Sequence, residues 1–159
     1  MKRLVSYFSA TGVTARVAND LAEAIGADMF EIQPESRYTA ADLDWKNPGS
    51  RSTVEMKNPS ARPPIACKLD TMAQYEEVYV GFPIWWYGAP RIVNTFLESY
   101  DFSGKTIIPF ATSGGSGAEK VDGTLRCEGA EVKGTCLMND REGLKSLSEH
   151  LASNHVELG

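Results

Sequence analysis

Three hydroxyl side chains and one glycine follow the first apolar run of the chain, in the segment Ser9-Ala10-Thr11-Gly12-Val13-Thr14. If a helix begins here, its free N–H groups and the positive end of its dipole can bind an anion. Gly12 lets the backbone approach a ligand closely, and the three hydroxyls can each donate a hydrogen bond. The lysine of a nucleoside-triphosphate P-loop is absent. The segment therefore suits a terminal phosphate held by neutral donors, with a plain helix start in solvent as the alternative.

A second segment contains consecutive aromatic residues, in the order Pro83-Ile84-Trp85-Trp86-Tyr87. Three adjacent rings cannot all point into one core, whatever the backbone conformation. A large exposed ring at the end of a strand is suited to stacking on a planar ligand. The alternative is that these rings fill the core or a contact with a second copy of the chain. For Trp85 and Trp86 we favour a ligand.

The third segment, Thr112-Ser113-Gly114-Gly115-Ser116-Gly117, consists of small residues that leave backbone donors accessible. Its N–H and hydroxyl groups could bind the polar edge of a heterocycle. It also nearly matches the nucleophile motif G-x-S-x-G, departing only at Ala118. A hydrolase built on Ser116 would need His150 or His155 and an acid, and a chain with two histidines gives this match little weight. A solvent-exposed loop before a helix is the remaining alternative.

Each of these segments follows a run that is typical of a β-strand. Five such runs are predicted strands, namely Leu4–Phe8, Asp28–Ile32, Val78–Phe82, Thr106–Ala111 and Ala130–Leu137. Apolar residues recur every four positions from Val13 to Ile25, which predicts a helix that ends at Gly26. Further helices are predicted with Pro90 as first residue, from a capping box of Ser116 and Glu119, and around Leu144, Leu147 and Leu151.

Strands that alternate with helices predict an open α/β sheet wound on both faces. Ligands of such sheets bind outside the carboxyl ends of the strands, where all three segments are expected to lie. Residues 33–74 contain five of the eight prolines and predict only short capped turns, at Thr39–Leu43 and Leu69–Tyr75. We interpret them as an elaborated crossover and expect residues 1–159 to form a single domain.

Composition excludes several classes of protein. The net charge is −5 with no cluster of Lys or Arg, so we expect no nucleic-acid partner. No apolar stretch approaches 18 residues, and the chain opens on a strand-like run without a leader, so we expect no membrane association. Three scattered cysteines and two histidines lack the spacing of a metal site. This cysteine usage favours the reducing cytoplasm.

Taken together, the three segments make the chain resemble the flavodoxins. The specific marks are Ser9–Thr14 after the first strand, Phe82–Gly88 after the third and Thr112–Gly117 after the fourth, and the resemblance covers nearly the whole chain. The Gly-Phe-Pro-Ile-Trp-Trp run is similar to that of one bacterial flavodoxin-like branch. The fifth predicted strand, Ala130–Leu137, lacks an obvious inserted loop, which resembles the short-chain form.

This resemblance implies a flavodoxin-like fold of five parallel strands in the order 2-1-3-4-5, non-covalent FMN and electron transfer. It also implies that residues 9–14 hold the FMN phosphate and that 83–87 and 112–117 flank the isoalloxazine ring. The implied FMN-binding residues are Ser9, Thr11, Gly12, Val13, Thr14, Pro83, Ile84, Trp85, Trp86, Tyr87, Thr112, Ser113, Gly114, Gly115 and Gly117. No residue is assigned a catalytic role, because no convincing general base lies near the expected flavin.

The leading hypothesis is an electron carrier that docks transiently on redox partner proteins, aided by its negative charge. Stacked aromatic rings and that charge both disfavour further negative charge on the reduced flavin, which lowers the potential of the second electron step. Segments 83–90 and 112–117 contain no acidic residue, unlike the flavin loops of flavodoxins. An FMN-dependent NAD(P)H oxidoreductase acting on a quinone or flavin therefore stays open as an alternative, as does a binding domain without flavin. The sequence leaves the oligomeric state open.

Overall fold

A computed structural model describes residues 2–113 and 121–138 of the chain. Its helices and strands follow in the order β1 (Arg3–Tyr7), α1 (Val13–Ile25), β2 (Asp28–Glu31), α2 (Arg51–Lys57), β3 (Glu77–Pro83), α3 (Arg91–Glu98), β4 (Thr106–Thr112), β5 (Glu131–Val132) and β6 (Cys136–Leu137). The predicted capping box at Ser116 and Glu119 and the predicted closing helix lie outside the described residues. None of the described helices is long and apolar enough to cross a bilayer.

The strands form one parallel sheet in the order β2-β1-β3-β4-β5, which confirms the predicted flavodoxin-like topology. The prediction of one continuous fifth strand over Ala130–Leu137 is wrong. Two short strands, β5 and β6, each pair with β4, and residues 133–135 separate them. The reason is a competing acceptor: the Asp122 carboxylate binds both the N–H and the hydroxyl of Thr135, at 2.9 and 2.6 Å. That N–H is therefore not donated to β4.

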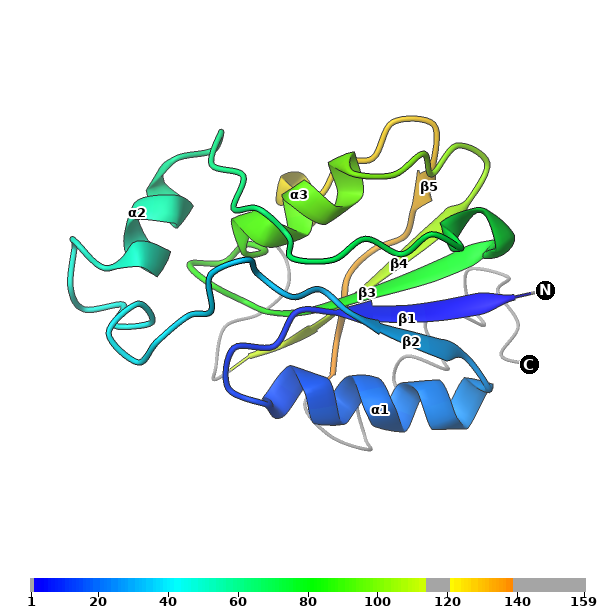
Figure 1. Ribbon diagram of the computed structural model, residues 1–159, viewed down its shortest axis with the longest axis horizontal. Helices are drawn as coiled ribbons and strands as arrows, with labels where there is room; N and C mark the ends of the chain where they lie inside the picture. The colour runs from blue at the N-terminus through cyan, green and yellow to red at the C-terminus, as the bar shows by residue number, and fades with distance from the viewer. Residues whose placement is uncertain (1, 114–120, 139–159) are drawn as a thin grey trace.

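Helices cover both faces of the sheet, with α1 on one side and α3 on the other (Figure 1). Because side chains alternate along a strand, Leu4 of β1 packs in the cluster beneath α3 and its neighbour Val5 in the cluster beneath α1. Both are fully buried, as are Val78 and Tyr79 of β3. A parallel sheet covered on both faces needs such continuous apolar runs, which is why the strands were readable in the sequence.

The ends of the two long helices follow local chemistry. Helix α1 spans the predicted residues and ends at Gly26, whose φ of 65° is the left-handed conformation that glycine adopts at little cost. Helix α3 begins one residue later than predicted. Pro90 caps it with an extended ψ of 145°, so Arg91 is the first helical residue. The loops that precede both helices are thereby placed at the carboxyl ends of β1 and β3.

Between β2 and β3 the chain makes an excursion, residues 32–76, whose first part with α2 projects beyond the carboxyl ends of the strands before the chain returns to the start of β3 (Figure 1). The predicted capped turn is present: Thr39 and Asp42 exchange backbone and side-chain hydrogen bonds of 2.9 and 3.2 Å. A 3₁₀ turn occupies Met72–Gln74. Helix α2 was not predicted, because seven residues show no helical period; its one local signal is Ser50, whose hydroxyl accepts from the Thr53 N–H.

Candidate functional site

The β1–α1 loop presents an uncapped helix N-terminus. Gly12 is the N-cap residue, with a φ of 94° that disfavours any residue with a side chain, and among the described residues no side chain caps α1. The Gly12 N–H donates to the Ser9 hydroxyl over 3.1 Å. Thr11, Gly12 and Val13 are exposed. Because first-turn N–H groups have no partner inside a helix, this loop offers aligned donors to an anion.

Thr14 occupies a different position from the other hydroxyl residues of the loop. It is 2% exposed, and its hydroxyl lies 2.8 Å from that of Thr112 at the end of β4, which is 3% exposed. One hydroxyl of the pair donates and the other accepts, so the acceptor keeps its own proton. The pair joins two of the three segments that the sequence singled out.

The β3 segment joins the same assembly through its backbone. Pro83 stands opposite Thr112 in the β3–β4 register, and the Ile84 N–H donates to the Thr112 carbonyl over 2.9 Å. Ser113 is half-buried beside them. The predicted residues Gly114, Gly115 and Gly117 lie outside the described residues, as do Ser116, His150 and His155 of the hydrolase alternative.

The aromatic segment forms a strained two-residue turn. The backbones of Trp85 and Gly88 exchange hydrogen bonds, each 2.9 Å long. The two residues at the tip, Trp86 and Tyr87, have φ values of 47° and 63°. Such turns normally carry Gly, Asn or Asp, and left-handed backbone costs other residues about 1–2 kcal/mol each. Strain of this kind persists where the surroundings enforce it, which is common at ligand sites.

The turn divides the three rings into two groups. Trp86 and Tyr87 are 43% and 56% exposed. Trp85 is half-buried and makes edge-to-face contacts with Phe8 and with Tyr38 of the excursion, at centroid distances of 5.7 and 5.4 Å. The structure therefore places one ring in a wall and two at the surface. Stacking of Trp85 or Trp86 on a flavin stays a prediction.

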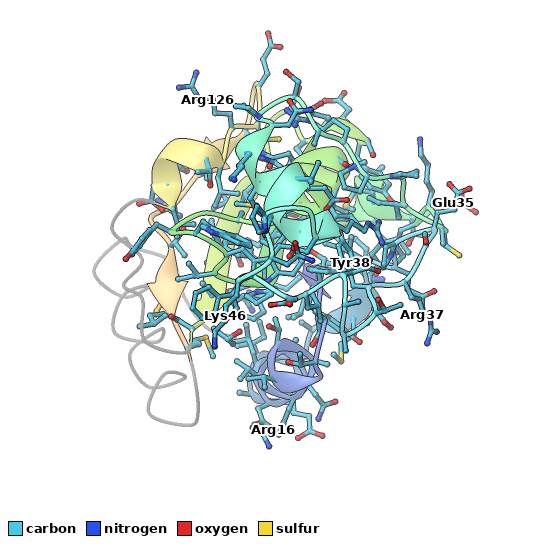
Figure 2. The ribbon with its side chains drawn as sticks, turned by 90° about the vertical axis from the view of Figure 1, so that its left-hand side faces the viewer. Arg16, Glu35, Arg37, Tyr38, Lys46 and Arg126 are labelled. Atoms are coloured by element: carbon cyan, nitrogen blue, oxygen red, sulfur yellow. The ribbon has the colours of Figure 1, made fainter. Side chains whose placement is uncertain are left out.

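Sequence reasoning allowed residues 33–74 to lie over a ligand, but it did not select the residues that the excursion contributes to this region. A cavity of about 300 Å³ adjoins the β1–α1 loop and is lined in part by Ser9, Ala10, Gln33, Arg37 and Tyr38. Figure 2 looks onto the carboxyl ends of the strands and shows Arg37 pointing outward at the margin, with Tyr38 further in. A single tyrosine in a polar, proline-containing segment carries no periodic signal, so the sequence offered no means of selecting it.

These features fit FMN at the level of chemistry. The uncapped start of α1 and the hydroxyl of Thr11 suit a phosphate held by neutral donors, and the exposed rings at the turn suit a planar heterocycle. When bound, FMN would supply one- and two-electron redox chemistry. The protein's own residues would bind and orient it.

The sequence model of the flavodoxins matches residues 2–154. The chain belongs to the flavodoxin family. It is 44% identical to a proposed flavoprotein from Bacteroides eggerthii, whose crystal structure aligns over 98% of this chain and 99% of that one with a TM-score of 0.89. A proposed flavoprotein from Bacteroides uniformis is 48% identical over 93% of this chain and 97% of that one, with a TM-score of 0.85.

A more distant member of this fold was solved with a flavin. The flavoprotein from Lactobacillus acidophilus, in complex with FMN, is 20% identical over 91% of this chain and 97% of that one, with a TM-score of 0.74. At that identity the likeness concerns the fold. Among curated proteins, none matches the chain.

Proposed function

We propose that this flavodoxin-family protein binds FMN non-covalently and carries electrons between redox partner proteins. The observation that carries the proposal is the meeting of the β1–α1 loop, the aromatic turn and the end of β4 at the carboxyl end of the sheet, where an uncapped helix start faces solvent. Ser9, Thr11, Gly12 and Val13 would hold the phosphate, and Thr14, whose hydroxyl is buried against Thr112, would contribute its backbone N–H. Pro83–Tyr87 and Thr112–Ser113 would flank the isoalloxazine ring.

Transient docking at this end is supported by exposed apolar side chains. Val13 of α1, Trp86 and Tyr87 of the turn, and Trp45 and Val54 of the excursion are all large hydrophobic residues with at least 42% of their surface exposed. Trp86 and Tyr87 are adjacent in the turn, and neighbouring exposed apolar side chains of this size are typical of interaction surfaces. A redox partner that docks here would approach the proposed flavin, and the net charge of −5 would favour a basic partner.

The test is a visible spectrum of the purified protein reconstituted with FMN and then followed through stepwise reduction. Flavin bands that remain after gel filtration, together with a separation of the two electron steps, support the carrier. A protein that elutes without flavin after reconstitution contradicts every redox function and leaves the binding domain.

An NAD(P)H oxidoreductase is the second proposal, and the cavity beside Ser9 favours it. Its lining includes Arg37, which lies at the margin (Figure 2) and carries a cation suited to a phosphate, and Gln33, suited to a polar ring edge; the acidic residue Glu31 also lines it. Stopped-flow mixing of the FMN-loaded protein with NADH or NADPH separates the two functions. Bleaching of the flavin at catalytic rates supports the oxidoreductase, and bleaching only over hours supports the carrier.

A further inference from the structure

The excursion contacts the aromatic turn through the ring of Tyr38. Its ring centroid lies 5.4 Å from that of Trp85 and 5.5 Å from that of Phe8, and Trp85 and Phe8 are 5.7 Å apart. All three contacts are edge-to-face, with interplanar angles of 65° to 88°. Phe8 is 1% exposed and belongs to the core. Trp85 is therefore held between a core ring that cannot move and a ring supplied by the excursion.

Tyr38 is itself fixed by two charged side chains of α2. Its hydroxyl donates to Glu55 Oε1 over 2.5 Å, and the Arg51 guanidinium lies 3.8 Å from the ring centroid. Arg51 Nε donates to the other Glu55 oxygen over 3.0 Å. Burial and then the bond to Glu55 raise the pKa of Tyr38 well above that of a free tyrosine, so its hydroxyl remains a donor at neutral pH.

Helix α2 also contacts the start of α3, which directly follows the aromatic turn. Arg91, the first residue of α3, donates to the Met56 carbonyl over 2.8 Å and to the Glu55 carbonyl over 3.4 Å. At Gly88 an added Cβ would meet Met56 Cε at 3.5 Å. These contacts link α3 to α2, α2 to Tyr38, and Tyr38 to Trp85. The excursion therefore packs directly against the turn.

The strain in the turn explains why such a support is needed. Trp86 and Tyr87 hold left-handed backbone that each would leave in an unsupported loop. The residue before them, Trp85, forms both hydrogen bonds that close the turn. A fixed Trp85 ring therefore limits the directions in which the two exposed rings can point.

We propose that Tyr38 is a positioning residue for the flavin. Held by Glu55 and Arg51, it fixes Trp85 and, through Trp85, the orientation of Trp86 and Tyr87 toward the isoalloxazine ring. The proposal rests on the proposed function in one respect, that FMN is the group positioned. The first part of the excursion then acts as a wall of the site.

The test compares Tyr38→Leu, which removes the ring, with Tyr38→Phe, which keeps the ring and loses the bond to Glu55. The matched control is Tyr75→Leu, because the Tyr75 hydroxyl also donates to a carboxylate, Asp28 Oδ2 at 2.7 Å, but belongs to the opposite end of the sheet. Tyr38→Leu is expected to weaken FMN binding about tenfold, because Trp85 loses the ring that fixes it. Tyr38→Phe, which loses the bond to Glu55 but keeps the ring, should weaken FMN binding about threefold, and Tyr75→Leu should leave the affinity unchanged.

Two further readouts separate positioning from mere stability. In ¹⁵N-tryptophan spectra of the FMN-free protein, the Trp85 indole resonance, assigned with Trp85→Phe, should shift and broaden in Tyr38→Leu and stay unchanged in Tyr75→Leu. The reduction potential of bound FMN should likewise move only in Tyr38→Leu. The FMN-free spectrum tests the Tyr38 contact even if the wild-type protein does not bind FMN, an outcome that would contradict the proposed function instead.

A folded Tyr38→Leu protein with wild-type FMN affinity and potential overturns the proposal, whether or not the indole resonance moves. If Tyr38→Leu does not fold, Glu55→Gln decides, because it keeps every ring and removes the charge that holds Tyr38 and Arg51. A Trp85 resonance that broadens in Glu55→Gln, with FMN bound about threefold more weakly, supports the positioning role. An unchanged resonance and affinity overturn it.

Discussion

The hydroxyl of Thr14, in the first turn of α1, lies 2.8 Å from the hydroxyl of Thr112, the last residue of β4, across 98 positions of sequence. Both side chains are buried, so each hydroxyl needs the other in place of water. Helix α1 covers one face of the sheet, and β4 is a strand of that sheet. This single bond therefore fixes the start of α1 next to the end of β4. The proposed phosphate loop is thereby attached to the proposed flavin loop.

Replacing Thr14 by Val should therefore lower the free energy of unfolding by about 1–3 kcal/mol, because the Thr112 hydroxyl stays buried without its partner. Removing both hydroxyls in Thr14→Val with Thr112→Val should cost less than the sum of the single changes. Urea denaturation of the four proteins measures the coupling. Additive losses would mean that the two hydroxyls do not depend on each other.

Thr11 offers a cleaner test of phosphate binding, because it is exposed and makes no described hydrogen bond to Thr112. Thr11→Val should weaken FMN about tenfold, the cost of one hydrogen bond to a charged group, and leave riboflavin binding unchanged. Fluorescence titration with both ligands measures the difference. Thr71→Val, at the opposite end of the sheet, is the control. Equal weakening for FMN and riboflavin would contradict a phosphate role for this loop.

Two substitutions of Trp86 distinguish its effect on FMN binding from its effect on stability. Trp86→Ala and Trp86→Gly both remove the exposed ring, and each should weaken FMN by about three- to tenfold. They should differ in stability: glycine tolerates the φ of 47°, so Trp86→Gly should be about 1 kcal/mol more stable than Trp86→Ala. Trp45→Ala, which removes an exposed ring of the excursion, should bind FMN as the wild type does. Identical unfolding midpoints for the Ala and Gly variants would show that the turn is unstrained.

Substitution of Gly81 tests how closely the side chain of Phe110 in β4 packs over β3. Gly81 stands opposite Phe110 in the β3–β4 register, and an added Cβ would lie 2.2 Å from Phe110 Cζ. Gly81→Ala should destabilise the protein by about 1–3 kcal/mol through this overlap. Phe110→Leu in the same chain should recover part of the loss. Gly123→Ala, where no atom lies within 4 Å of the added carbon, is the thermal-melt control, and an equal effect at both glycines would refute the overlap.

Local patterns predicted the elements that local forces decide. The four-residue period from Val13 to Ile25 gave a helix with those ends, since one apolar face is enough to specify an amphipathic helix. The strand runs gave a parallel sheet in the expected order. For the last strand, prediction failed because a group outside it decided the outcome: Asp122 binds Thr135 and interrupts the strand, which no property of Ala130–Leu137 reveals. Helix α2 was missed for a different reason, because seven residues are too few to show a helical period.

The same distinction holds within the site. Residue types alone singled out the hydroxyl loop, the aromatic run and the small-residue segment as candidates, because a phosphate and a planar ring would need such side chains wherever the chain folds. Only the tertiary structure decided that Thr14 turns inward to Thr112 and that Trp85 packs on Tyr38 while Trp86 and Tyr87 remain exposed. Tyr38 is 47 positions from Trp85, and contacts over such separations depend on how the sheet brings strand ends together.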